Sequence, residues 1–201
     1  MRINRLTHRV IVYGAVLILL FAASPAFAAT YKVDSDHTTV SFKARHLFSN
    51  VIGTFKQFEG TFDYEPGQPE TWKVNATVQT ASIDTNVTQR DNHLRSPDFF
   101  DAEKYPTLTF SSTKVTDLAA GSAKLEGLLT IHGIGQPVVF DLTINGVGKD
   151  PWGNTRASFS ATTKIDRKDF GLTWNKVLES GQLLVGDEIT ITLEVEGLLQ
   201  A

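Results

Sequence analysis

The sequence predicts an all-β fold, an antiparallel barrel of about eight strands with a short helical insert between two of them. After residue 28, apolar and polar residues alternate along nearly the whole chain, which is the period of a strand with one buried face. Turn-forming residues separate the alternating runs at short intervals. A two-sheet sandwich would share both features. Closure into a barrel, however, removes exposed sheet edges. This favours a barrel for a chain that has no cysteine and therefore no disulfides to stabilise it.

The first 28 residues have the pattern of a secretory signal peptide. Arg2, Arg5 and Arg9 precede an apolar run over residues 10–23, and Ala26-Phe27-Ala28 fits a small-x-small cleavage site. The run is shorter than the roughly 20 residues of a membrane-spanning helix, so an uncleaved anchor is the weaker interpretation. We therefore expect export to the periplasm and one mature domain, residues 29–201.

Composition excludes several classes of function. Cleavage would remove 3 of the 19 basic residues and none of the 22 acidic ones, leaving a net charge of −6. A mildly acidic domain without basic runs argues against a nucleic-acid partner. The absence of cysteine excludes disulfides, thiolate chemistry and covalent c-type haem.

The apolar rows of the expected strands interleave large and very small residues. Phenylalanines recur with Ala44, Ala76, Ala157 and Ala161 in the same inward-facing rows. Ordinary interdigitation in a filled core could explain this mixture. An eight-stranded barrel is also wide enough to hold one slim ligand, and small residues on several strands favour that interpretation.

Phe55 is out of phase with the row that starts at Phe58 and continues through Phe62. Either a bulge near Lys56-Gln57 restores its inward direction, or the ring faces outward.

Between residues 84 and 110 the alternation stops and helix signals appear. Asn86 could cap a short helix, with Gln89 completing the reciprocal cap. Ser96-Pro97-Asp98 would start a second helical turn, which Tyr105-Pro106 would end. Such an insert is either a lid or head-group site, or a plain connection between strands.

The insert contains a charged cluster made of Arg90, Asp91, His93 and Arg95. Arg90 and His93 would share a helix face and could hold a phosphate or carboxylate head group, while Asp91 and Arg95 could pair. Alternatively, Arg90 and Asp91 fasten the insert to the barrel through buried hydrogen bonds, which we favour for Asp91. The sequence has no nucleophile elbow, glycine-rich phosphate loop or metal-ligand spacing of histidines, so no motif supports catalysis. We name no catalytic residue and expect no metal and no cofactor.

Six ordered motifs resemble the YceI-like family of bacterial periplasmic proteins, also called the polyisoprenoid-binding family. They occupy residues 40–46, 53–62, 90–101, 105–112, 127–133 and 167–171, and so span almost the whole mature chain.

The resemblance implies a lipocalin-like barrel that binds a polyisoprenoid or another long-chain amphiphilic lipid, including quinone-like ones, as a carrier and not as an enzyme. It also suggests a cytochrome b561-type membrane protein as a partner, and a second copy of the chain is a further candidate partner. The chain-lining positions expected from the matching strands are Phe42, Ala44, Phe58, Phe62, Val74, Ala76, Val78, Leu108, Phe110, Leu129, Phe140, Leu142, Ala157, Phe159 and Ala161. The alternative is a hydrolase or isomerase of such a lipid, with Asp91 and His93 as acid and base.

Overall fold

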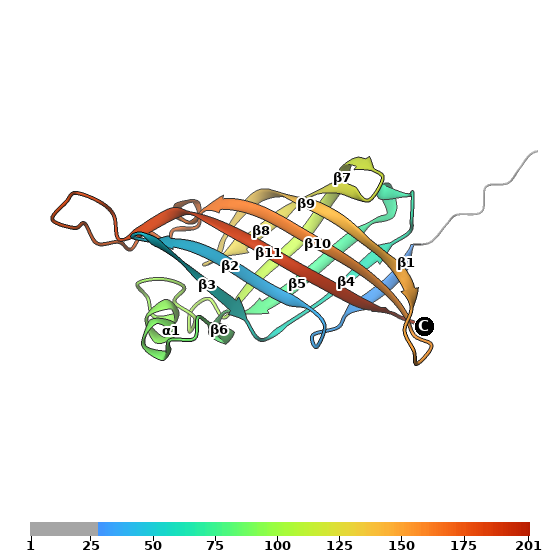
Figure 1. Ribbon diagram of the computed structural model, residues 1–201, viewed down its shortest axis with the longest axis horizontal. Coiled ribbons are helices and arrows are strands. Elements are labelled where there is room, and N and C mark those ends of the chain that lie inside the picture. The colour runs from blue at the N-terminus through green and yellow to red at the C-terminus, as the bar shows by residue number, and fades with distance from the viewer. Residues whose placement is uncertain (1–27) are drawn as a thin grey trace, which may run out of the picture.

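A computed structural model of the chain describes residues 28–201, so the expected signal peptide lies outside the described residues except for Ala28 (Figure 1). The described elements, in chain order, are β1 (Ala29–Val33), β2 (Thr39–His46), β3 (Ser49–Phe55), β4 (Phe58–Tyr64), η1 (Pro69–Thr71), β5 (Lys73–Gln79), η2 (Thr80–Ser82), β6 (Ile83–Asp84), α1 (Thr88–Arg95), β7 (Thr107–Ala119), β8 (Ser122–Ile131), β9 (Ile134–Lys149), β10 (Thr155–Asp166), η3 (Arg167–Phe170) and β11 (Val185–Leu199). Among residues 28–201, no helix has both the length and the apolar character needed to cross a membrane.

The strands form one antiparallel sheet that closes on itself through β1. Tyr31 of β1 lies opposite Phe62 of β4 on one side and opposite Leu199 of β11 on the other. The remaining neighbours follow in the order β4, β5, β7, β8, β9, β10 and β11. The sandwich alternative is therefore wrong, and the predicted barrel is confirmed.

Three of the eight strands in the barrel are interrupted. β1 and β2 both pair with the single long strand β11, one beyond the other along its length. On their other side, β1 pairs with β4 and β2 pairs with β3. β5 and β6 likewise pair with β4 and β3. With each of these pairs of segments counted as one interrupted strand, the barrel has the eight strands that the sequence predicted.

The break between β3 and β4 falls at Lys56-Gln57 and resolves the orientation of Phe55. Phe55 is buried, at 7% exposure, and its ring lies 5.8 Å from that of Phe42 and 6.0 Å from that of Phe100. The two extra residues turn the chain so that Phe55 and Phe58 both face inward, as the bulge alternative required.

The helical insert has one helix where the sequence suggested two helical segments. Val87, not Asn86, precedes α1, and no side chain caps it. Asn86 instead adopts a left-handed conformation, φ 61°, with its N–H donating to Asp84 Oδ1 at 2.8 Å. Beyond α1 the chain makes consecutive hydrogen-bonded turns, in which Ser96 O accepts from the N–H groups of Phe99 and Asp101. The expected cap and second helix are thus wrong, because short side chains here bond to local backbone.

Aromatic residues fill the barrel at the end that carries both termini. Tyr31 stacks on Phe62 with ring centroids 5.1 Å apart, and Tyr64 packs edge-on against Trp72 at 4.7 Å and Phe159 at 4.9 Å. The indole N–H of Trp72 donates to the Glu65 carbonyl at 2.8 Å. This end of the interior is therefore closed and its one buried indole donor is satisfied.

At several glycines, among them Gly127 and Gly53, the missing Cβ leaves room for a phenylalanine ring close to the barrel wall. A Cβ on Gly127 would lie 2.5 Å from the Phe110 ring and 2.6 Å from the Ser111 carbonyl oxygen, and one on Gly53 would lie 2.4 Å from the Phe42 ring. Any other residue would push these rings off the wall and into the middle of the barrel.

Gly127→Ala is expected to lower the free energy of unfolding by about 1–3 kcal/mol, because the added methyl group overlaps both a ring and backbone. Gly148→Ala, where a Cβ would meet nothing within 4 Å, is the matched control. Urea denaturation of both variants measures the difference. Equal midpoints would show that the Phe110 ring does not depend on Gly127.

Candidate functional site

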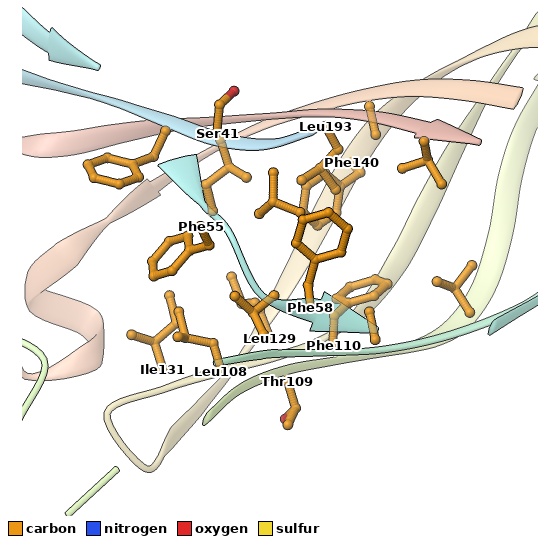
Figure 2. Close-up of a pocket in the computed structure, with 18 of the residues that line it drawn as sticks. Ser41, Phe55, Phe58, Leu108, Thr109, Phe110, Leu129, Ile131, Phe140 and Leu193 are labelled. Atoms are coloured by element: carbon orange, nitrogen blue, oxygen red, sulfur yellow. The ribbon is translucent and has the colours of Figure 1, made fainter. Parts of the chain in front are cut away.

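The inward-facing side chains enclose a cavity of about 280 Å³ inside the barrel. Figure 2 shows Phe55, Phe58, Phe110 and Phe140 projecting into one common space from different strands, while the hydroxyl group of Thr109 points away from it. The cavity extends from the aromatic cluster at the terminal end to the residues of the α1 insert at the other. Its wall is almost wholly apolar.

Fourteen of the fifteen positions expected to line a bound chain are in this wall, contributed by seven different strands. They are Phe42, Ala44, Phe58, Phe62, Val74, Ala76, Val78, Leu108, Phe110, Leu129, Phe140, Leu142, Phe159 and Ala161. Ala157 is fully buried but lies outside the wall. It pairs with Gly197 and Val147, at the end where the aromatic cluster already fills the barrel.

Sequence reasoning missed the part of the wall that the insert supplies. Leu94 lies between His93 and Arg95 of the charged cluster, and Phe99 and Phe100 follow it. All three line the cavity, with Phe100 beside Phe55. Strand periodicity could not identify them, because they lie in a helix and irregular turns. The prediction also omitted four cavity-lining residues of β11, although they alternate in the sequence as the other rows do: Ile189, Ile191, Leu193 and Val195.

Asp91 and Arg90 bind α1 to Thr85, the residue that directly follows β6. Asp91 is 6% exposed, and its Oδ1 accepts hydrogen bonds from the backbone N–H of Thr85 at 2.8 Å and from the Thr85 hydroxyl at 2.5 Å. Arg90 donates to the Thr85 hydroxyl and carbonyl oxygens, both at 2.7 Å. These hydrogen bonds are the ones expected if Arg90 and Asp91 fasten the insert in place. They also use N–H groups of Arg90 that a bound head group would need.

Arg95 makes a second attachment. Its guanidinium donates to the carbonyl oxygens of Ala81 at 2.7 Å and Ile83 at 2.6 Å, and to Asn92 Oδ1 at 3.1 Å. The expected pairing of Asp91 with Arg95 is therefore wrong, since each side chain bonds to different backbone groups. Hydrogen bonds near both ends of α1 therefore attach the helix to residues 81–85, the segment that precedes it.

His93 packs between the insert and the segment that joins β10 to β11. Its Nε2 is 2.8 Å from Asp98 Oδ2, and its ring packs edge-on against Phe99 at 5.0 Å and Trp174 at 4.8 Å. Arg90, Asp91 and His93 all lie outside the set of residues that line the cavity. A head group in the cavity would therefore meet other residues first, and an acid–base pair of Asp91 and His93 would not face a lipid in it.

Asp91→Ala is expected to lower the free energy of unfolding by about 2–3 kcal/mol, because it leaves buried donors of Thr85 without an acceptor. Asp98→Ala removes an exposed carboxylate from the same insert and serves as the control. Urea denaturation measures both. An Asp91→Ala variant as stable as the Asp98→Ala variant would contradict the fastening role.

Arg167 is the buried cation in the cavity wall. At 3% exposure it donates to the carbonyl oxygens of Gly186, Leu172 and Trp174 and to Asp187 Oδ1. The hydrogen bond from Lys168 and the positive charge of Arg167 hold the pKa of Asp187 below its usual range. Arg167 therefore secures both ends of the segment between β10 and β11, and its donors are occupied.

A second charged cluster surrounds Arg156 near the terminal end. Its guanidinium contacts Asp34 at 2.7 Å and Asp150 at 2.9 Å, and it also pairs with Glu196. Asp34, His37 and Glu196 lie close enough together to suggest a cation site. The guanidinium already supplies their positive charge, so the cluster is an ion-pair network.

The Arg156 network shifts the pKa values of its carboxylates. The hydrogen bond from Arg156 lowers the pKa of Asp34, and a bond with His37 adds to the effect. Burial acts to raise the pKa of Asp150, but hydrogen bonds from Asn154 and Arg156 outweigh it and hold this pKa at about 2.

We expect the stability of the fold to decrease as the pH falls from about 4 toward 2. The unfolded aspartates titrate near pH 3.9, so the network's contribution is complete above that pH and is lost as the folded carboxylates protonate. Urea midpoints measured against pH test this, with Arg156→Met as the comparison. The variant should be less stable at pH 7 and lose less on acidification; identical pH slopes would contradict the account.

Comparisons with known proteins agree with this geometry. The family model of the YceI-like domain matches residues 31–197. Protein YceI of Escherichia coli is 42% identical over 185 residues, which cover 90% of this chain and 93% of that protein. The crystal structure of the YCEI protein of Campylobacter jejuni is 36% identical, with a TM-score of 0.68 over 78% of this chain and 90% of that chain.

A polyisoprenoid binding domain from Saccharophagus degradans, implicated in plant cell wall breakdown, has a similar fold. Its TM-score is 0.65, and the match covers 86% of this chain and 99% of that domain. The two sequences are 14% identical, so this likeness concerns the fold alone.

Proposed function

Because this chain belongs to the YceI-like family, we propose that its barrel binds the hydrocarbon chain of a polyisoprenoid or similar long-chain lipid, as a carrier in the periplasm. The observation that carries the proposal is the apolar cavity of about 280 Å³ along the barrel interior. The fold shared with the polyisoprenoid binding domain of Saccharophagus degradans supports the same ligand class.

The character of the cavity wall favours a slim, flexible hydrocarbon. The volume is near the lower end of the usual range for ligand sites, about 300–1,000 Å³. A prenyl chain requires no polar partner along its length, and each buried CH₂ contributes about 0.8 kcal/mol. Ten carbons would therefore supply on the order of 8 kcal/mol before ordering costs.

The arrangement of the polar groups favours binding over catalysis. Arg167 is buried and lines the cavity. Its N–H groups already donate to carbonyl and carboxylate oxygens of the protein. Asp91 and His93 bond to Thr85 and Asp98. A quinone-like head group and transfer to a cytochrome b561-type partner stay predictions.

Ala161→Phe tests whether the cavity takes up the chain. Ala161 lines the cavity, whereas its neighbour Thr162 is exposed on the outer face of β10, so Thr162→Phe adds the same ring outside. Uptake of all-trans-geranylgeraniol, measured by titration and by mass spectrometry after solvent extraction, should fall at least about 10-fold in Ala161→Phe, because the ring occupies space that the chain needs. It should be unchanged in Thr162→Phe.

Equal uptake by both variants would place the binding site outside the barrel. No uptake by the parent chain at any concentration tested would contradict isoprenoid binding itself. Circular dichroism and urea denaturation establish that both variants are folded, so that a loss of uptake is not a loss of the barrel.

A further inference from the structure

Three strongly exposed apolar side chains lie together at the end of the barrel opposite the termini. Phe48, in the turn between β2 and β3, is 80% exposed, while Val177 and Leu183, in the segment between β10 and β11, are 70% and 46% exposed. We call these three residues the apolar tip. The two segments adjoin, because Leu47 N–H donates to the Leu184 carbonyl at 3.0 Å.

The segment that carries Val177 and Leu183 is a short hairpin with its own internal bonds. Val177 and Leu183 form an antiparallel bridge, and Leu184 N–H donates to the Lys176 carbonyl at 2.9 Å. Figure 1 shows this hairpin projecting beyond the strands at the end of the barrel that also carries the turn between β2 and β3. Apolar side chains on a projecting hairpin gain little from packing within the protein, so their exposure calls for a partner.

The hairpin begins and ends at the wall of the cavity. Leu172 and Val185 flank it in sequence, and both line the cavity, as does Ala44 at the base of the turn that carries Phe48. The opposite end of the interior is filled by the aromatic cluster of Tyr31, Phe62, Tyr64, Trp72 and Phe159. The apolar tip therefore lies at the end where a chain could reach the cavity.

We propose that the apolar tip docks the protein on the surface of a lipid bilayer, with this end of the cavity facing the membrane. The inference rests on the proposed function, because a ligand of this kind is dissolved in a membrane and must be withdrawn from it. The charges beside the tip fit an anionic bilayer: Arg45 and Lys176 are exposed, against Glu179 alone on the hairpin. Arg167 and Lys168 share the single carboxylate of Asp187, at 3.0 and 2.6 Å, while Lys164 pairs with Glu188 at 3.0 Å, so these groups leave one further positive charge.

The other end of the barrel supplies a matched control. Trp152 is 79% exposed in the turn between β9 and β10, and the twelve residues of β10 separate that turn from the hairpin segment. Its own N–H donates to Asp150, a carboxylate of the Arg156 network. A single tryptophan in a turn held by a carboxylate is a poorer anchor for an anionic surface than three clustered apolar side chains.

The test is co-flotation of the chain starting at Ala29, which contains every described strand and lacks the apolar run of residues 10–23 that would itself bind lipid. The vesicles are phosphatidylethanolamine and phosphatidylglycerol in a 3:1 ratio, an experimental choice of about one anionic lipid in four. Replacing Phe48, Val177 and Leu183 together by Ser should weaken vesicle partitioning on the order of 100-fold. Trp152→Ser should leave it unchanged.

Geranylgeraniol uptake separates this proposal from the proposed function. The triple variant should take up geranylgeraniol from dilute ethanol solution as the parent does, and should take it up from vesicles much more slowly. A triple variant that partitions like the parent overturns the docking proposal, as does loss of partitioning in Trp152→Ser alone. A change from dimer to monomer in sedimentation without any change in partitioning would show that the tip binds a second copy, which also overturns it.

If the parent partitions onto vesicles but takes up no geranylgeraniol from either source, the proposed function fails while the docking surface stands.

Discussion

The pairing of β1 with both β4 and β11 is the constraint on which the rest of the structure depends. It turns an open sheet with two edges into a closed wall, so that the inward-facing side chains of all its strands surround one common space. Without it the apolar rows would need a second layer to cover them. With it, they can leave the middle of the barrel empty, and the interrupted strands and the α1 insert become parts of one continuous enclosure.

The cavity results from how large and small residues are distributed around this wall. The aromatic cluster fills one end, while Ala44, Ala76 and Ala161 leave room in the rest, and Gly53 and Gly127 let the Phe42 and Phe110 rings lie close to the wall. A protein interior normally packs to the density of a crystal, and an unfilled apolar cavity lowers stability. The hydrogen bonds of Asp91, Arg95 and Arg167 fix the segments that surround this space. These charged side chains of the family motifs lie beside the cavity and bond to the protein itself.

Sequence periodicity predicted about eight strands and the apolar rows that face the interior, because alternation reports directly which face of a strand is buried. The family resemblance gave those rows their expected role in lining a bound chain, and 14 of the 15 positions so named line the cavity. Periodicity failed where local side-chain-to-backbone bonds decide the conformation, and where structure depends on contacts between distant segments. Asn86 has the chemistry of a helix cap, but its position is decided by a bond to Asp84. Leu94, Phe99 and Phe100 lie in a charged, irregular segment, and only the fold brings them to the cavity. Ala157 belongs to the right row but faces the filled end. The apolar tip was invisible for the same reason, since Phe48 and Val177 are far apart in sequence.

The central claim is that the interior of the barrel holds a lipid chain in the cell. Native mass spectrometry of the protein purified without detergent from its own organism tests this most directly. The account predicts a complex heavier than the processed chain by the mass of one long-chain lipid, which is released on collisional activation and identified as an isoprenoid by fragmentation. A population consisting wholly of the bare chain, or carrying a small polar molecule in place of a lipid, would contradict it.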